Sequence, residues 1–242
     1  MTVDRKVALV TGAGHRVGRA FALALGERGY DIAVHFHSAN TQAAETVAKI
    51  AAGGAHAEAF EEDLVSGEGP ARLVQSVIER MSRLDVVVNS AAVMVRTPAD
   101  QVTVDQWDSI FALNLRAPFF IAQAAARVMT EGGVIVNISD LAAFETWPAY
   151  IPHAISKAGV VKMTESLAKV LAPKIRVNAI APGAILLPDD WDEEQGKRFA
   201  STTPLKRIGD PSDAVAALLY LLDAEFVTGE TIVVDGGRRI RK

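Results

Sequence analysis

A glycine-rich turn near the start of the chain has the composition of a phosphate-binding loop. It reads Thr-Gly-Ala-Gly-His-Arg-Val-Gly from Thr11 to Gly18, after a short apolar run and before a stretch with helical spacing. Glycine lets the backbone approach a pyrophosphate closely, and the N-terminus of a helix offers N–H groups and a positive dipole. A turn without a ligand is the simpler alternative, but the position between a strand and a helix favours a dinucleotide.

The end of the second expected strand bears on which nicotinamide cofactor is used. Enzymes that prefer NAD usually carry an acid there, which binds the ribose hydroxyls. Here the strand runs into His37-Ser38-Ala39-Asn40, which has no carboxylate and can hydrogen-bond a 2′-phosphate. We therefore expect NADPH to be preferred, with NAD possible. Asp63, after the third strand, is placed either to accept from the adenine amino group or to cap the next turn.

Two basic side chains stand four residues apart where a helix is expected. His153 and Lys157 would share one face of that helix. An imidazole can donate a proton, and its unperturbed pKa of about 6.5 lies near working pH. The charge of Lys157 disfavours the imidazolium form, whereas Asp140 favours it if its carboxylate lies close. These three residues are candidates for acid–base chemistry.

Short apolar runs alternate with helical patterns along the whole chain. Several runs are rich in Val and Ile without alternation, which is typical of parallel strands buried on both faces. The expected strands are 6–11, 31–36, 55–60, 84–89, 133–138, 175–180 and 231–234, and the expected helices are 17–28, 41–52, 69–82, 103–129, 155–171 and 211–222. This order predicts a single α/β domain over residues 1–242: a doubly wound (Rossmann) seven-stranded parallel sheet with helices on both faces.

One segment is expected to be a loop over the substrate. It spans about 184–203, and its part 189–200 is expected to cover the pocket. Trp191 either faces the pocket or packs within the loop.

Composition narrows the class of protein. Half of the 242 residues are hydrophobic, the net charge is −4, and cysteine is absent. Disulfides and Cys-ligated metals are therefore excluded, no metal site is expected, and nothing favours a nucleic acid as partner. No apolar run suggests a signal peptide or an uncharged membrane span, so a cytoplasmic enzyme is expected. The basic end, with Arg238, Arg239, Arg241 and Lys242, is expected to be a solvated tail.

A series of short motifs follows one order along the chain. They are the Thr-Gly turn at Thr11, Asp63-Leu64, Asn89-Ser90-Ala91-Ala92, Asn114, Ser156-Lys157-Ala158-Gly159, the stretch 178–183, the stretch 204–209, Thr228-Gly229-Glu230 and the stretch 234–237. In this order and at these spacings, the whole chain resembles the short-chain dehydrogenase/reductase family. The resemblance implies that the cofactor contacts Gly12, His15, Arg16, Val17, Gly18, His37, Ser38, Asp63, Leu64, Asn89, Ser90, Ala91, Lys157, Pro182 and Gly183.

The resemblance also implies a catalytic set, with one residue changed. In that family a tyrosine exchanges a proton with the substrate, and a lysine four residues later lowers the tyrosine's pKa and holds the nicotinamide ribose. A serine or aspartate orients the substrate, and an asparagine positions water. Lys157, Asp140 and Asn114 match three of these positions, but the tyrosine position is occupied by His153. Tyr150 is not expected to replace it, because Pro152 is expected to start the helix.

The change at His153 leaves three readings open. In the first, the histidine is a working acid with altered chemistry. In the second, the chain is an impaired enzyme that still binds cofactor. In the third, the histidine is a structural residue in a chain with another role. Its side chain is shorter than tyrosine, and reach is the first requirement for a proton donor. The presence of Asn114, Asp140 and Lys157 favours the first reading.

Within the family, some details resemble the pteridine reductase branch. They are Arg16 in the turn, the His35-Phe36-His37 stretch, Asp140 in place of a serine, and the stretch 182–188 that leads into the substrate loop. That branch stacks the pterin on an aromatic residue where this chain has Val93, so stacking there is reduced. Other walls can come from Met94, Phe144, Trp147 and Tyr150. The implied substrate contacts are Arg16, Val93, Met94, Asp140 and Trp191.

These observations predict an NADPH-dependent reductase of a small carbonyl or cyclic imine, pterin-like or other, acting by hydride transfer. The alternative is a catalytically impaired dinucleotide-binding protein that serves as a sensor or binding module. A 3-oxoacyl or sugar-alcohol dehydrogenase is disfavoured by Asp140. A homotetramer, or at least a dimer, is expected, because the helices 103–129 and 155–171 carry apolar residues beyond what one sheet face needs: Phe119, Phe120, Val160, Val161 and Met163.

Overall fold

The computed structural model describes residues 5–185 and 192–240 of the chain, and a single parallel sheet organises them. Its seven strands lie in the order β3-β2-β1-β4-β5-β6-β7. They are β1 (Val7–Val10), β2 (Asp31–Phe36), β3 (Ala57–Glu61), β4 (Val86–Asn89), β5 (Gly133–Ile138), β6 (Ile175–Pro182) and β7 (Thr231–Val234). The chain order reverses between β1 and β4, and in such sheets the crevice at the carboxyl ends of those strands receives the ligand.

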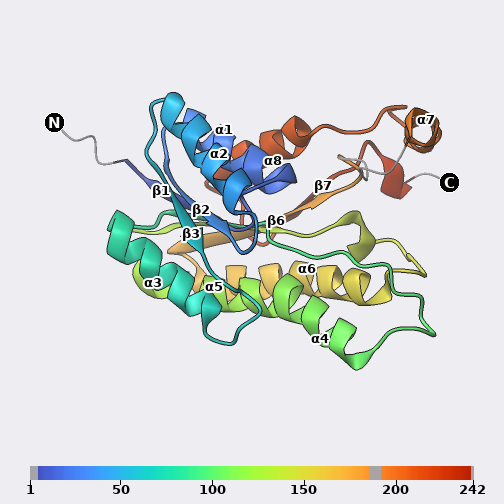
Figure 1. Cartoon of the computed structure of the whole chain (residues 1–242), viewed down its shortest axis with the longest axis horizontal. Helices are drawn as coiled ribbons and strands as arrows, with labels where there is room; N and C mark the ends of the chain where they lie inside the picture. The colour runs from blue at the N-terminus through green and yellow to red at the C-terminus, as the bar shows by residue number, and fades with distance from the viewer. Residues whose placement is uncertain (1–4, 186–191, 241–242) are drawn as a thin grey trace.

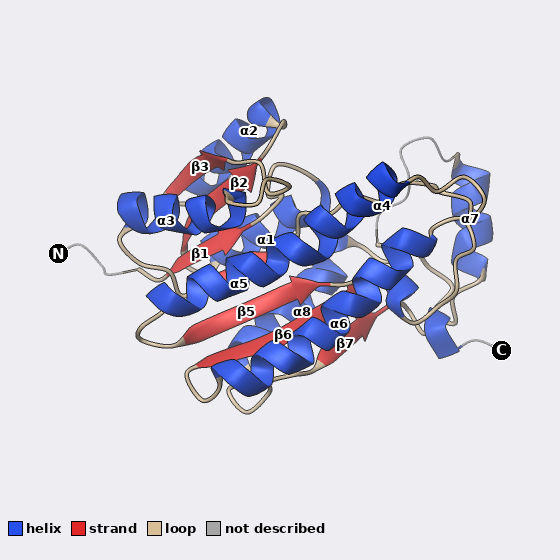
Figure 2. Cartoon of the chain, turned by 90° about the horizontal axis from the view of Figure 1, so that it is seen from below, coloured by secondary structure: helices blue, strands red, loops and turns tan. Residues whose placement is uncertain are grey.

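Helices cover both faces of the sheet, as expected for a doubly wound fold. On one face lie α1 (Arg16–Glu27), α2 (Asn40–Ala52) and α8 (Pro211–Asp223) (Figure 1). On the other lie α3 (Gly69–Met81), α4 (Val104–Phe111), α5 (Ala117–Val128) and α6 (Ile151–Leu171), which cross the sheet in Figure 2. The central strands β1 and β4 are thereby fully buried, and the predicted fold class is confirmed.

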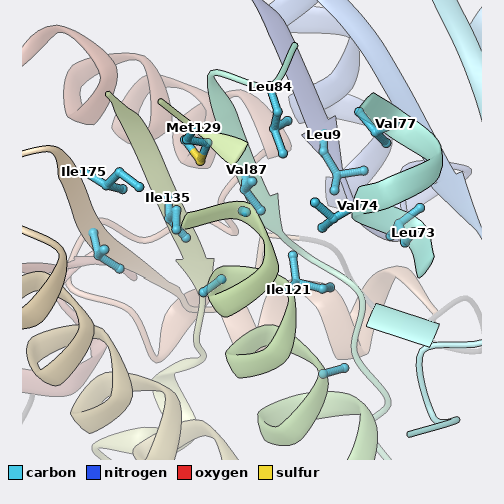
Figure 3. Packing of buried hydrophobic residues seen from close by; sticks show 14 of the residues in the cluster. Leu9, Leu73, Val74, Val77, Leu84, Val87, Ile121, Met129, Ile135 and Ile175 are labelled. Carbon is cyan, nitrogen blue, oxygen red and sulfur yellow. The ribbon is translucent and has the colours of Figure 1, made fainter. Parts of the chain in front are cut away.

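The hydrophobic core is divided by the sheet into two layers. Leu9 and Val87 point toward α3 and α5, where they pack with Val74 and Ile121 (Figure 3). Val10, the neighbour of Leu9, belongs to the opposite layer beneath α1. Successive strand residues enter opposite layers, and both layers are hydrophobic, so the strands read as continuous apolar runs.

The expected helix 103–129 is interrupted. It consists of α4, a π-helical turn η1 (Ala112–Arg116), and α5. In the turn, the N–H of Ala117 donates to the carbonyl of Ala112, five residues back. Pro118 has no N–H to continue the α-helical pattern toward Asn114, which accounts for the change of pitch. The whole stretch Val104–Val128 is long and apolar enough to cross a membrane, but Ile121 is buried against the sheet, as in a core helix.

Two further boundaries differ from expectation. Helix α6 begins at Ile151 rather than at 155, with Pro152 in its first turn and Tyr150 as N-cap. The expected substrate loop contains a helix, α7 (Glu193–Ser201), whose N-terminus is capped by a capping box between Asp192 and Gln195. Trp191 lies outside the described residues.

Candidate active site

A cavity of about 980 Å³ lies over the crevice between β1 and β4 and continues along the end of β5. Most of the predicted site residues line it: Gly12, His15, Arg16, Val17, Gly18, His37, Ser38, Asp63, Leu64, Ser90, Ala91, Val93, Met94, Asp140, His153, Lys157, Pro182 and Gly183. Two described residues of the predicted set, Asn89 and Asn114, are buried and are not part of this lining. The fold therefore brings predicted residues from seven separate segments of the chain together in one cavity.

The glycine-rich turn is packed too closely for side chains. Thr11 accepts hydrogen bonds from the N–H groups of Ser90 and Ala91, at 2.9 and 3.0 Å, and so ties the end of β1 to the end of β4. A Cβ on Gly12 would lie 3.0 Å from the Cα of Ala91, and one on Gly18 only 2.2 Å from the carbonyl oxygen of Gly12. These glycines let the start of α1 sit directly on the turn.

The N-terminus of α1 has the character of an anion site. Its N-cap residue, His15, makes no side-chain hydrogen bond to the helix, and its first turn contains no acid. The first N–H groups of any helix lack partners within the helix and carry positive partial charge. This cradle fits a pyrophosphate.

His35 has a structural position. Its Nδ1 accepts from the N–H of Gly12 at 3.1 Å, and its Nε2 lies 3.1 Å from the carbonyl oxygen of Glu62. Burial lowers the pKa of His35 to about 4, so the ring is neutral and donates from Nε2. Of the His35-Phe36-His37 stretch, His37 is the exposed histidine, so the expected phosphate-binding role can rest only on the end of that stretch.

Asp63 and Asn89 have clear local partners. Asp63 accepts from the N–H of Val65 at 2.8 Å, so it caps the turn after β3 while it lines the cavity. Asn89 donates to Asn137 at 2.9 Å, and Asn137 in turn donates to Thr164 of α6. Asn89 thus joins β4, β5 and α6 beneath the cavity.

The three predicted acid–base residues converge at the end of β5. Nε2 of His153 lies 3.7 Å from Oδ2 of Asp140. His153 is 2% exposed, and within the described residues its Nε2 has no hydrogen-bond partner. Lys157, one turn along α6, donates to the carbonyl of Ile138 at 2.8 Å. Burial lowers the pKa of Lys157 to about 8, and the nearby charge of Asp140 partly opposes this shift.

Asn114 lies next to His153 and fixes the main chain that contacts it. Its Oδ1 accepts from the N–H of Val93 at 2.8 Å, and its Nδ2 donates to the carbonyl of the same residue at 2.9 Å. It lies in the π turn η1, which carries its side chain toward the segment after β4. Asn114 therefore holds a main-chain unit that also contacts His153, at 3.2 Å from Nδ1.

An aromatic wall lines the far part of the cavity. The rings of Trp147 and Tyr150 meet edge to face, with centroids 6.3 Å apart, and both residues line the cavity beside Met94. Met94 is 49% exposed and so presents apolar surface. Phe144 is not in this lining; its ring lies under the guanidinium of Arg239 at 4.9 Å.

Arg238 contradicts the expectation of a solvated tail, whereas Arg239 is exposed and Arg241 and Lys242 lie outside the described residues. Arg238 lines the cavity, with its guanidinium 4.2 Å from the ring centroid of Phe199 in α7. Its Nε lies 3.7 Å from a carboxylate oxygen of Glu145. Phe199 and Arg238 belong to the site region but are 39 residues apart in sequence. No local pattern connects them.

Comparisons with known proteins agree on the family. The family model described as enoyl-(acyl carrier protein) reductase matches residues 12–239. Hydroxynaphthalene reductase-like protein Arp2 of Metarhizium guizhouense is 38% identical over 252 residues, covering 96% of this chain and 94% of that protein. Acetoin dehydrogenase YohF of Salmonella typhimurium superimposes with a TM-score of 0.91 at 34% identity, covering 98% and 97% of the two chains. The angucycline C-6 ketoreductase LanV, solved with NADP, also gives 0.91, at 30% identity, covering 98% and 96%.

Proposed function

The chain belongs to the short-chain dehydrogenase/reductase family of oxidoreductases, and we propose that it uses NADPH to reduce a carbonyl or cyclic imine of a small molecule. The observation that carries this proposal is Nε2 of His153, which is buried beside Asp140 at the cavity and has no hydrogen-bond partner within residues 5–185 and 192–240, with Lys157 one turn away. A buried polar atom without a partner is costly and calls for an occupant. A substrate oxygen or nitrogen is that occupant.

The cofactor would lie across the crevice, with its pyrophosphate on the turn at Gly12 and the start of α1. When bound, it supplies the hydride. Lys157 would hold the nicotinamide ribose, and Pro182 and Gly183, at the end of β6, would border the nicotinamide. Asn89 acts from beneath through its buried amide chain rather than by direct contact.

The preference for NADPH rests on the end of β2. His37 and Ser38 are exposed at the cavity, and no carboxylate follows the strand to repel a 2′-phosphate. Arg16, whose backbone has a φ of +52°, also lines the cavity. The ketoreductase LanV holds NADP, which supports the same assignment by relationship.

In the reaction, His153 would give the proton to the substrate and Asp140 would stabilise its charged form. Lys157 supplies a positive charge near the developing oxyanion. Asn114 is a positioning residue that acts through Val93. The substrate would lie against Val93, Met94 and Asp140, with Trp147 and Tyr150 as the aromatic wall that Val93 does not provide. A flat, ring-containing substrate, pterin-like or other, suits that wall.

A second function follows from the same histidine. If His153 cannot transfer a proton, the chain is a dinucleotide-binding protein that acts as a sensor or binding module. Turnover separates the two functions, because both require NADPH to bind.

The expected homo-oligomer has a surface available. Phe119 and Phe120 are each 39% exposed beside a groove of about 930 Å³ between η1, α5 and α6. Val160, by contrast, is buried within the chain, and Met163, 9% exposed, lies at the floor of the groove. We expect a second copy to cover this groove, and Phe120→Lys to shift the mass measured by light scattering toward the monomer. A wild-type monomer at micromolar concentration would contradict this.

A substrate panel tests the proposed reaction. Ketones, fused-ring aromatic ketones and quinonoid dihydropterins would each be offered with NADPH and with NADH, and the loss of reduced nicotinamide followed by absorbance. We expect turnover with NADPH on at least one class. Tight NADPH binding without turnover on any of them would favour the sensor.

A further inference from the structure

The two ring nitrogens of His153 have different surroundings. Nδ1 faces the protein: it lies 3.2 Å from the carbonyl oxygen of Val93 and 3.4 Å from the amide nitrogen of Asn114. Nε2 faces Asp140 and has no hydrogen-bond partner among the described residues. Which nitrogen carries the proton of the neutral ring decides what the residue can do.

The hydrogens of Asn114 settle that question. An amide nitrogen has two hydrogens. Its nearest acceptors are the carbonyl of Val93, at 2.9 Å, and Oγ of Ser156, at 3.2 Å. The hydroxyl of Ser156 gives its own hydrogen to the carbonyl of His153 at 2.7 Å, so this oxygen is free to accept. Both amide hydrogens are therefore used, and none remains for Nδ1 of His153.

We propose that Asn114, Ser156 and the carbonyl of Val93 hold neutral His153 with its proton on Nδ1, so that Nε2 is the atom that exchanges a proton with the substrate. This rests on the reductase function proposed above. A neutral ring then presents a lone pair to the cavity and can only accept a proton there. The ring donates a proton only as imidazolium, with Asp140 as its counter-charge.

This assignment separates the two directions of the reaction. In reduction, the carbonyl carbon receives a hydride from the reduced nicotinamide, which is thereby oxidised. The carbonyl oxygen takes the proton from Nε2 of the imidazolium, so that a C–H and an O–H bond replace the C=O π bond. In oxidation of the alcohol, the neutral ring accepts the hydroxyl proton at Nε2, and the hydride of the carbinol carbon passes to the oxidised nicotinamide. Reduction should therefore fall with rising pH while oxidation rises.

Charged and polar groups face the ring of His153 from four segments. Oδ2 of Asp140, at the end of β5, lies 3.7 Å from Nε2, and Lys157 lies one turn further along α6. The π turn η1 presents the neutral amide of Asn114, and the segment after β4 presents the carbonyl of Val93. Among these groups, Asp140 is the anion that lies beside Nε2 and can act as the counter-charge of the imidazolium.

The tautomer can be measured without a substrate. In protein labelled with ¹⁵N-histidine, at a pH where the rings are neutral, ring nitrogen shifts and couplings distinguish the two tautomers. We expect Nδ1–H for His153. His35 is an internal reference of the opposite kind, since its Nδ1 accepts from Gly12 and its Nε2 donates to Glu62. A wild-type His153 with its proton on Nε2 would overturn the proposal.

One substitution should reverse the tautomer. In Ser156→Ala, an amide hydrogen of Asn114 loses its acceptor and can turn to Nδ1, so the Nε2–H form should become the major one. Ser139→Ala is the matched control: that hydroxyl is also buried and bonded to the backbone of α6, at the carbonyl of Lys157, without touching Asn114. We expect the control to keep the wild-type tautomer. An unchanged tautomer in Ser156→Ala would also overturn the proposal.

The kinetic consequence is tested on Asp140. In Asp140→Asn, the rate of reduction near neutral pH should fall at least about tenfold more than the rate of oxidation. Equal losses in both directions would contradict the role of Asp140. Failure of the proposed function looks different: the Nδ1–H tautomer would be found, but no substrate would turn over.

Discussion

His35 and His153 are equally buried, at 2% exposure each, yet they differ in how their nitrogens are satisfied. Both nitrogens of His35 are hydrogen-bonded to main-chain groups, and the ring joins the glycine-rich turn to the end of β3. His153 has one nitrogen held by the protein and the other turned to a carboxylate in the cavity. The comparison teaches that burial does not by itself separate structural from chemical histidines; an unsatisfied nitrogen does.

The largest expected effect is on His153. His153→Ala should lower the rate on any substrate found by about 10²-fold or more, which is the usual contribution of a positioned acid. The dissociation constant of NADPH should stay within about twofold, because the turn and Lys157 carry that binding. Steady-state kinetics and cofactor titration measure the two quantities. Undiminished turnover would remove His153 from the reaction.

His153→Tyr sharpens the same test. A phenol ring places C–H groups where Nδ1 now contacts the carbonyl of Val93, and it reaches further into the cavity. We expect activity below that of wild type, because the contacts with the carbonyl of Val93 and with Asp140 suit an imidazole ring. A gain would show instead that the histidine is a weakened version of the family's tyrosine.

His35 should affect stability more than chemistry. His35→Ala leaves the N–H of Gly12 and the carbonyl of Glu62 without their partner and opens a cavity, so unfolding free energy should fall by roughly 2–3 kcal/mol. His37→Ala, at the exposed end of the same strand, is the matched control and should stay within about 0.5 kcal/mol. Urea unfolding measures both. Similar values for the two variants would contradict the structural role of His35.

The pH dependence of stability follows from His35. Its pKa is about 4 in the folded protein and near the ordinary value of 6.5 when unfolded, so the unfolded chain binds the extra proton first as pH falls. The stabilisation that neutral His35 contributes to the folded protein is complete above the unfolded-state pKa of 6.5. It is lost as the pH falls toward the folded-state pKa. Between about pH 7 and about pH 5 the loss should be about 2 kcal/mol. His35→Gln, which does not titrate, should lose that part of the slope in urea unfolding.

The smallest expected effect lies beyond His35, at the surface end of β2. Ser38→Asp places a carboxylate where a 2′-phosphate would bind, so NADPH affinity should fall about tenfold relative to NADH, or about 1.4 kcal/mol. Asn40→Asp, the equivalent change two residues further on, is outside the cavity lining and serves as control. An unchanged preference in Ser38→Asp would place the 2′-phosphate elsewhere.

Element positions followed from local patterns where those patterns were strong. The predicted strands 31–36, 133–138 and 231–234 match β2, β5 and β7 at both ends. The π turn within the predicted helix 103–129 was not foreseen. Helical periodicity scarcely distinguishes five π-helical residues, and a proline is tolerated in the first turn of a new helix.

The candidate site was predicted as a set of residues but not as a geometry. The spacing of His153 and Lys157 placed them on one helical face, and their motif order placed Asp140 nearby. Nothing in the spacing of the motifs indicated that the side chain of Asn114 would form hydrogen bonds with both the N–H and the carbonyl of Val93. That contact depends on the π turn and on the path of the chain after β4.

The sequence by itself determined the parallel sheet, the glycine turn that suits a dinucleotide, and the absence of a tyrosine four residues before Lys157. Each is a local property of residue type and spacing. Tertiary structure decided the opposite roles of His35 and His153, the contact of Arg238 with the ring of Phe199, and which nitrogen of His153 faces Asp140. These depend on hydrogen-bond partners that lie between 23 and 60 residues away, or on ring contacts between distant segments, and no local pattern encodes them.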